Sequence, residues 1–159
     1  MDNLNNIYLI LKNSTTYPVV STEYLNIIEK KFNIILPNEF KIFYSQFSNG
    51  IRINRRRLHN IERIVSQLDK DKINKKFNFK QSLVWGDELS IQPHPEVEYG
   101  NIEVADMGDG MIWRLIVNGN EYGKMWLSTE MGIEKCHTDL NFLEWFELWS
   151  QKKDNLINE

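Results

Sequence analysis

The side chains best suited to catalysis or metal binding are few and widely separated in this sequence. The chain has one cysteine, Cys136, and three histidines, His59, His94 and His137. Only Cys136 and His137 are adjacent, and neighbours on a strand point to opposite faces, which is unlike the spacing of the usual zinc ligands. A nucleophilic Cys136 would also need a base and an electropositive setting. We therefore expect a strand-end thiol near the surface or half-buried, with no catalytic residue and no metal site.

Two loop motifs resemble ligand-binding or metal-binding segments, but their sequences do not favour either function. His94 lies between Pro93 and Pro95, which hold an extended loop, so we interpret it as a loop residue and not as a ligand. The segment 106–110, Asp-Met-Gly-Asp-Gly, suggests calcium, but it lacks the alternating oxygen ligands and final glutamate of an EF-hand. We interpret it as a glycine turn. No phosphate-binding loop or dinucleotide fingerprint occurs, so we expect no enzyme and no cofactor.

The charged residues are segregated along the chain, although the formal net charge is only −3. Between residues 51 and 80 there are ten Lys or Arg and three Asp or Glu, which gives this stretch a charge of +7. Between residues 81 and 113 there are seven Asp or Glu and no Lys or Arg. A cationic third is therefore followed by an anionic one.

The basic stretch permits a nucleic-acid hypothesis. Arg55, Arg56 and Arg57, with the lysines that follow, would contact phosphates and make binding steeply dependent on salt. The sequence pI near 5.7 and the adjacent acidic stretch oppose general affinity for nucleic acid. We expect no nucleic-acid partner, and we interpret the run as a solvated helix face and loop or as the complement of an acidic toxin.

Helical periodicity dominates the first third of the chain. Phe40, Phe43, Tyr44 and Phe47 follow Pro37 at helical spacing, which predicts a helix that opens at the proline and packs one aromatic stripe. Asn49-Gly50 supplies a left-handed stop. Three further helices are predicted over about 4–11, 22–32 with a cap at Ser21 or Thr22, and 58–68, the last followed by a lysine-rich loop over 69–76.

The pattern then changes to short strands and ends in a helix. Strands are predicted over 81–85, 101–106, 112–117 and 124–128, because glycine and asparagine turns separate these apolar runs. Asn141 and Glu144 form a capping-box variant before an aromatic helix with Phe142, Trp145, Phe146 and Trp149. We predict an α+β fold in which N-terminal helices and a C-terminal aromatic helix flank an antiparallel β-sheet of about four to six strands.

Size and composition indicate one domain spanning residues 1–159. The chain is 42% hydrophobic and 12% aromatic, which provides a real core. No apolar run approaches the length of a membrane span, and the N-terminus lacks the features of a secretory signal. A single cysteine excludes an internal disulfide framework. We expect a cytoplasmic protein without a membrane partner.

The order of these elements resembles the SUKH superfamily, in its Smi/Knr-like branch. The opening part of the resemblance consists of Ile28-Glu29, Phe32-Asn33-Ile34, Leu36-Pro37, the helix from Phe40 to Phe47, and Asn49-Gly50. The second part is the strand and glycine turn over 102–110, the strand over 115–117, and Gly123-Lys124-Met125-Trp126. The closing part is the aromatic helix that starts at Asn141. The family's usual second glycine after Asn49-Gly50 is Ile51 here, and the segment from Arg52 to Glu98 matches no motif.

The resemblance implies an immunity protein. Bacterial members of the family neutralise polymorphic toxins, often nucleases, by direct binding, whereas fungal members act as regulatory hubs. The expected partner is a cognate toxin; the alternative is a regulatory or scaffold module without a toxin partner. The resemblance also implies that the family's fold, and no catalytic constellation, carries the function.

A toxin that binds nucleic acid has a cationic groove, which an acidic surface can occupy. We therefore predict partner binding by the acidic stretch and by two aromatic residues expected to be exposed. The alternative is that these are ordinary solvated loop and hairpin residues. The predicted partner-binding residues are Asp87, Glu88, Glu96, Glu98, Tyr99, Asp106, Asp109 and Trp113.

Overall fold

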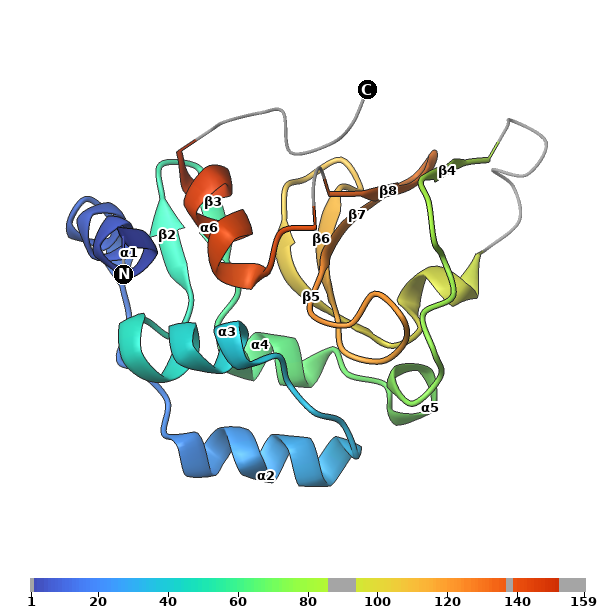
Figure 1. Cartoon of the computed structure of the whole chain (residues 1–159), viewed down its shortest axis with the longest axis horizontal. Helices are drawn as coiled ribbons and strands as arrows, with labels where there is room; N and C mark the ends of the chain where they lie inside the picture. The colour runs from blue at the N-terminus through green and yellow to red at the C-terminus, as the bar shows by residue number, and fades with distance from the viewer. Residues whose placement is uncertain (1, 86–93, 137–138, 152–159) are drawn as a thin grey trace.

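A computed structural model describes residues 2–85, 94–136 and 139–151. These residues form helices and an antiparallel sheet, so the fold is α+β (Figure 1). The α-helices are α1 (Asp2–Lys12), α2 (Thr22–Phe32), α3 (Asn38–Ile42), α4 (Ile61–Ser66), α5 (Lys70–Ile73) and α6 (Phe142–Ser150). A π-helical turn, η1 (Phe43–Phe47), and a 3-10 turn, η2 (Pro95–Glu98), complete the helical elements of the described residues.

Within the described residues, the sheet has eight strands in the order β1-β2-β3-β5-β6-β7-β8-β4. All strand pairs are antiparallel, as the turn-separated strands predict. The strands are β1 (Thr15–Thr16), β2 (Ile51–Ile53), β3 (Arg56–Leu58), β4 (Leu83–Val84), β5 (Asn101–Asp106), β6 (Ile112–Ile116), β7 (Met125–Thr129) and β8 (Gly132–Lys135). The prediction of four to six strands is wrong in number, because several strands are only two or three residues long and carry no alternating pattern.

Helix α1 forms as predicted but leaves Leu4 and Tyr8 exposed, whereas α2 agrees fully with the periodicity. Ser21 caps α2, since its Oγ accepts a hydrogen bond from the Tyr24 amide at 3.1 Å. The stripe of Leu25, Ile28 and Phe32 is buried, and Asn33 ends the helix in the left-handed conformation with φ of 54°. The α2 stripe therefore faces the core as predicted.

The aromatic helix after Pro37 has a less regular geometry than the sequence predicts. The chain forms α3 and then widens into the η1 turn, in which the Ser48 amide donates to the Phe43 carbonyl at 3.1 Å. This wider turn frees the Tyr44 carbonyl to accept from the Val20 amide at 3.0 Å. The aromatic stripe is buried as predicted.

The stop after this helix depends on a glycine. Gly50 has φ of +80°, and a Cβ there would lie 2.8 Å from the Leu58 carbonyl oxygen. Its left-handed backbone lets the chain reverse directly into β2. The hairpin of β2 and β3 follows.

The predicted helix over 58–68 and the loop after it require correction. Leu58 is the last residue of β3, and α4 begins at Ile61 with Asn60 as its cap. Leu58 fits a helical spacing with Ile61, but its backbone pairs with Ala105 of β5 instead. The lysine-rich stretch also contains α5, which Asp69 caps by accepting from the Asp71 amide. Tertiary pairing and a local cap explain both differences.

The C-terminal half follows the sequence pattern closely. The bounds of β5 agree with the prediction, β6 ends one residue earlier than predicted, β7 begins and ends one residue later, and β8 adds a strand that begins at Gly132. Helix α6 has the full capping box: Asn141 accepts from the Glu144 amide, and Glu144 accepts from the Asn141 amide, each at 3.0 Å. Lys152 and Lys153, which follow this helix in the sequence and would suit the negative end of its dipole, lie outside the described residues.

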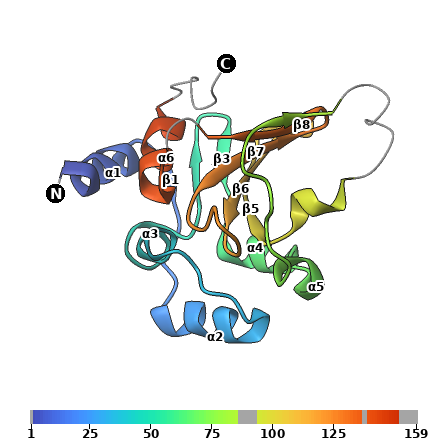
Figure 2. The same ribbon diagram turned by 45° about the vertical axis from the view of Figure 1, so that its right-hand side comes forward.

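The two faces of the sheet are covered differently. The main core lies between one face of the sheet and the helices, and it takes buried residues from α1 to α6 and from η1 (Figure 2). The opposite face over β6 to β8 carries a second, smaller core of Phe77, Trp85, Val97, Ile116, Trp126 and Ile133. No helix within the described ranges is long and apolar enough to cross a membrane. The second face is the one that carries an open cavity.

Candidate functional site

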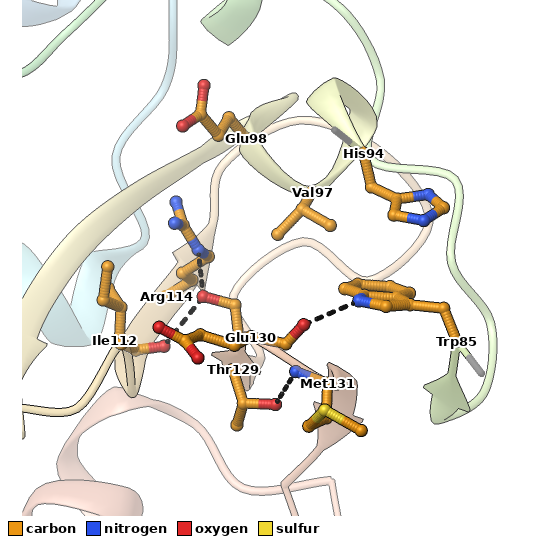
Figure 3. Close-up of a pocket in the computed structure, with 11 residues that line it drawn as sticks. Trp85, His94, Val97, Glu98, Ile112, Arg114, Thr129, Glu130 and Met131 are labelled. Atoms are coloured by element: carbon orange, nitrogen blue, oxygen red, sulfur yellow. Dashed lines mark hydrogen bonds between the residues drawn. The ribbon is translucent and has the colours of Figure 1, made fainter. Parts of the chain in front are cut away.

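A cavity of about 610 Å³ opens on the second face of the sheet, beside the smaller core (Figure 3). Strands β6 and β7 provide its floor, η2 one wall, and the end of β4 another. We call the cavity the sheet pocket. Its lining residues are Trp85, His94, Val97, Glu98, Gly110, Ile112, Arg114, Ser128, Thr129, Glu130 and Met131.

Arg114 is the buried charge beneath the sheet pocket, with 5% of its surface exposed. Its Nε donates to the Ser128 hydroxyl at 2.7 Å, and Nη1 donates to the Asn101 side-chain oxygen at 3.2 Å. Its Nη2 lies 3.3 Å from a carboxylate oxygen of Glu103, the residue directly opposite on β5. The guanidinium therefore connects β5, β6 and β7 across one face.

Two opposing effects act on the protonation of Arg114. Burial lowers the pKa of its guanidinium, and the neighbouring Glu103 and Glu98 carboxylates raise it. An arginine keeps its proton at any physiological pH. Arg114 and Glu103 thus form a buried, hydrogen-bonded ion pair, and the pocket floor has little net charge from these two groups.

Aromatic side chains form the wall of the sheet pocket next to β4. The rings of Trp85 and His94 stack with centroids 4.2 Å apart and an interplanar angle of 21°. Trp85 is held from below, because its Nε1 donates to the Glu130 carbonyl at 2.9 Å (Figure 3). His94 Nδ1 lies 3.5 Å from Glu96, while its buried Nε2 has no hydrogen-bond partner among the described residues.

The pocket rim combines carboxylates with exposed apolar side chains. We define the pocket rim as Glu98, Glu130 and Met131, which line the cavity, together with their neighbours Glu96 on η2 and Met111 between Gly110 and Ile112; all five are exposed or half-buried. Met131 is 50% exposed and Met111 36% exposed. Beside the rim lies β4, the edge strand of the sheet, which leaves apolar surface on Leu83 and Val84 open to solvent. Such a mixture of apolar and acidic groups is suited to contact with a protein.

The structure brings only part of the predicted acidic face together. Glu96 and Glu98 lie on η2, and Glu98 lines the sheet pocket. Glu98 also forms an ion pair with Lys72 of α5, so one lysine of the basic stretch neutralises part of the acidic one. Tyr99 is half-buried, and the Lys75 ammonium lies 4.6 Å from the centre of its ring. Asp87 and Glu88 lie outside the described residues.

The other two predicted carboxylates lie at the β5–β6 turn. Asp106 and Asp109 are exposed, and Asp106 accepts from the Gly108 amide at 2.8 Å. Asp106 also lies close enough to His59 to raise its pKa, against the opposite effect of Arg57 and Arg63. Because Ala105 pairs with Leu58, Asp106 lies beside the strand that carries Arg56 and Arg57, and it does not extend an unbroken acidic surface.

Trp113 is buried, so the prediction that it is exposed is wrong. Only 4% of its surface is accessible, and its ring centre lies 5.5 Å from that of Trp145 on α6. Alternation along β6 explains this, because Trp113 and Leu115 face the helical core and Arg114 between them faces the pocket. Once one residue of β6 is known to face the core, the alternation along the strand predicts that Trp113 is buried.

Sequence reasoning missed Arg114, Trp85, Glu130 and Met131. A signal was present for Arg114, since a single charge inside the apolar strand Ile-Trp-Arg-Leu-Ile requires a partner when the strand is buried. Trp85 and Met131 are far apart in sequence and meet only because β4 pairs with β8. No local pattern predicts that pairing.

Two observations concern possible metal ligands and the cysteine thiol. In residues 2–85, 94–136 and 139–151, no three His, Cys, Asp or Glu side chains group closely enough to hold a metal ion. Cys136 has 3% of its surface exposed and belongs to the main core. The expectation of a half-buried or surface thiol is therefore wrong, because the end of β8 lies under the helical layer.

Comparison of the chain with protein-family models, with curated proteins and with solved structures finds no match. The sheet pocket and its rim are therefore interpreted from their own geometry.

Proposed function

We propose that this protein is an immunity protein of the SUKH type, which binds and neutralises a cognate toxin through the pocket rim and the neighbouring edge strand β4. The observation that carries the proposal is the rim itself: Glu98, Glu130 and the half-exposed Met131 line the cavity, and Glu96 and the exposed Met111 are sequence neighbours of other lining residues. A toxin that acts on nucleic acid has a cationic groove that fits this charge. Apolar side chains in the centre would supply most of the affinity.

The geometry of the site also supports a rigid binding surface. The Arg114 network holds three strands together below the pocket, and the indole hydrogen bond of Trp85 fixes one wall to the β7–β8 turn. A surface that is ordered before binding loses less conformational entropy when the complex forms. This favours stoichiometric masking of a toxin's active site or substrate groove.

The direct test is co-expression with the toxin domain encoded by a neighbouring reading frame. The proposal expects restored growth and a purified complex of one toxin with one copy of this chain. A toxin domain that remains lethal and forms no complex would contradict it. A neighbouring region without any toxin gene would favour the alternative, a regulatory or scaffold module.

Charge reversal tests the placement of the interface. The Glu130→Lys variant should slow association with a cationic toxin about tenfold at low salt, because it replaces attraction at the rim with repulsion. Glu23→Lys is the matched control, since Glu23 is exposed in the first turn of α2, away from the pocket. Equal association rates for both variants would reject the rim as the contact surface.

A further inference from the structure

The β2–β3 hairpin separates its arginines into two groups with different roles. Arg56 points toward the C-terminal end of α6 and donates to the Trp149 carbonyl. Arg52 and Arg57 are exposed and lie directly opposite each other across the β2–β3 ladder. Arg55 is exposed in the turn between the two strands. We call Arg52, Arg55 and Arg57 the arginine face.

The pairing of Arg52 with Arg57 is unfavourable in the isolated protein. Directly opposite residues on one sheet face have Cβ atoms about 5 Å apart, and like charges at that separation destabilise the sheet. Within the described part of the chain, neither guanidinium forms an ion pair or a side-chain hydrogen bond with a carboxylate. An external anion placed between them would remove this repulsion and gain charge-assisted hydrogen bonds.

We propose that the arginine face binds a short acidic segment of a partner protein, through carboxylates that bridge Arg52 and Arg57. This inference rests on the proposed function, because it assigns a second contact surface to the same class of partner. Recognition would then use both signs of charge: the partner's basic groups at the pocket rim and its acidic groups at the arginine face. Such a double requirement would increase discrimination between related toxins.

Charge around the arginine face favours an acidic protein segment over nucleic acid. The chain has a net charge of −3, and Asp106 at the end of β5 lies beside the strand that carries Arg57, because the adjacent residues Leu58 and Ala105 pair across β3 and β5. A nucleic acid carries a phosphate at every nucleotide, so its charge would extend past the hairpin and over such carboxylates. A short acidic peptide can place its charges on the arginines alone.

The experiment uses the whole protein and two fluorescent probes of equal charge. Anisotropy titrations compare a hexaglutamate peptide with a seven-nucleotide thymidylate strand, which has six phosphates, in about 20 mM salt, where screening is weak. We expect the peptide to bind more tightly than the oligonucleotide. Absence of peptide binding would overturn the proposal, and tighter binding of the oligonucleotide would overturn the assignment to a protein segment.

Matched variants locate the site. The double variant Arg52→Gln, Arg57→Gln should bind the peptide at least about tenfold more weakly, since it loses two charge-assisted contacts. The control Lys70→Gln, Lys76→Gln removes the same charge from two exposed lysines of the same basic stretch, and it should change affinity less than about twofold if long-range attraction contributes little. Equal losses in the two variants would contradict a localised site.

A stability measurement checks the premise independently of any partner. Without peptide, Arg57→Thr should raise the denaturant midpoint in about 20 mM salt, because it relieves the repulsion with Arg52. The gain should shrink in about 500 mM salt. A midpoint that falls equally at both salt concentrations would contradict the repulsion. The peptide and stability measurements do not require the neighbouring toxin. A negative result in them would therefore contradict this inference alone, whereas a toxin that forms no complex would contradict the proposed function.

Discussion

At the scale of single residues, His59 shows how burial changes the chemistry of a side chain. It is 3% exposed, and its Nδ1 has no hydrogen-bond partner in the described structure. Its backbone is held on both sides, because the amide donates to Val104 at 2.8 Å and the carbonyl accepts from the Tyr44 hydroxyl at 2.6 Å. Burial lowers the pKa of His59 to about 4, with Arg63 adding to the decrease.

This pKa predicts a loss of stability in mild acid. The unfolded chain takes up a proton on His59 near pH 6.5, whereas the folded protein does so only near pH 4. The free energy of unfolding should therefore fall as pH decreases from about 6.5 to 4, by roughly 2–3 kcal/mol from this group. The measurement is denaturant unfolding at several pH values.

His59→Gln provides the comparison for that prediction. The variant loses buried packing at all pH values, but it lacks the titrating group. The difference in unfolding free energy between the wild type and the variant should therefore narrow as pH falls through this window. A difference that stays constant with pH would show that His59 does not titrate as described.

At the scale of elements, the end of each helix and strand depends on local chemistry that can be tested separately. The start of α6 depends on Asn141, which accepts from the Glu144 amide. Asn141→Ala should lower the free energy of unfolding by about 1 kcal/mol, because an amide of the first turn loses its partner. Asn141→Asp should retain stability, since its carboxylate also caps the helix and interacts favourably with the positive end of the helix dipole. Chemical denaturation of both variants checks this, and equal losses would exclude a capping role.

The attachment of β4 depends on a residue without a side chain. A Cβ on Gly132 would overlap the carbonyl oxygen of Leu83 on the paired strand. Gly132→Ala should displace β4 and lower the free energy of unfolding by about 1–3 kcal/mol. The Trp85 indole proton, which donates to Glu130, should shift in the NMR spectrum as the pocket wall moves. Val84→Ala, at a side chain 65% exposed, should change neither quantity appreciably.

The secondary structure could be predicted well where one local pattern was sufficient. The stripes of α2 and α6, the caps at Ser21 and Asn141, and the bounds of β5 all come from near neighbours in the chain. Prediction failed where a distant segment decided the outcome. Leu58 joined a sheet because Ala105 was available to pair with it, and periodicity contains no information on such a partner.

At the scale of the whole molecule, two hydrophobic cores of unequal size contribute to the stability of the fold. The main core lies between the helices and the sheet, whereas the smaller one is confined to the second face near β4, β7 and β8. Regions with less buried apolar surface open at lower free energy. The pocket wall is ordered in the native state, but it belongs to the part of the protein with the lower free energy of opening.

Native-state hydrogen exchange should resolve this difference. Amides of β4, and those of β8 that pair with it, should exchange through openings of lower free energy than the amides shared by β5 and β6. The strand pair at the centre has neighbours on both sides, while β4 is an edge. Uniform protection across the sheet would indicate that both cores unfold as one unit.

The candidate site illustrates what depends on the complete fold. The sequence alone determined an α+β protein with an aromatic, helix-covered core, because the spacing of apolar residues and the caps and turns act between neighbours in the chain. It also placed Glu96 and Glu98 in an acidic stretch. Only the tertiary structure decided that Trp113 is buried, that Glu98 faces Lys72, and that a pocket forms above Arg114. These outcomes depend on which strands become neighbours in the sheet. The pairing of strands is determined by the burial of apolar residues from distant parts of the chain, and no local pattern contains it.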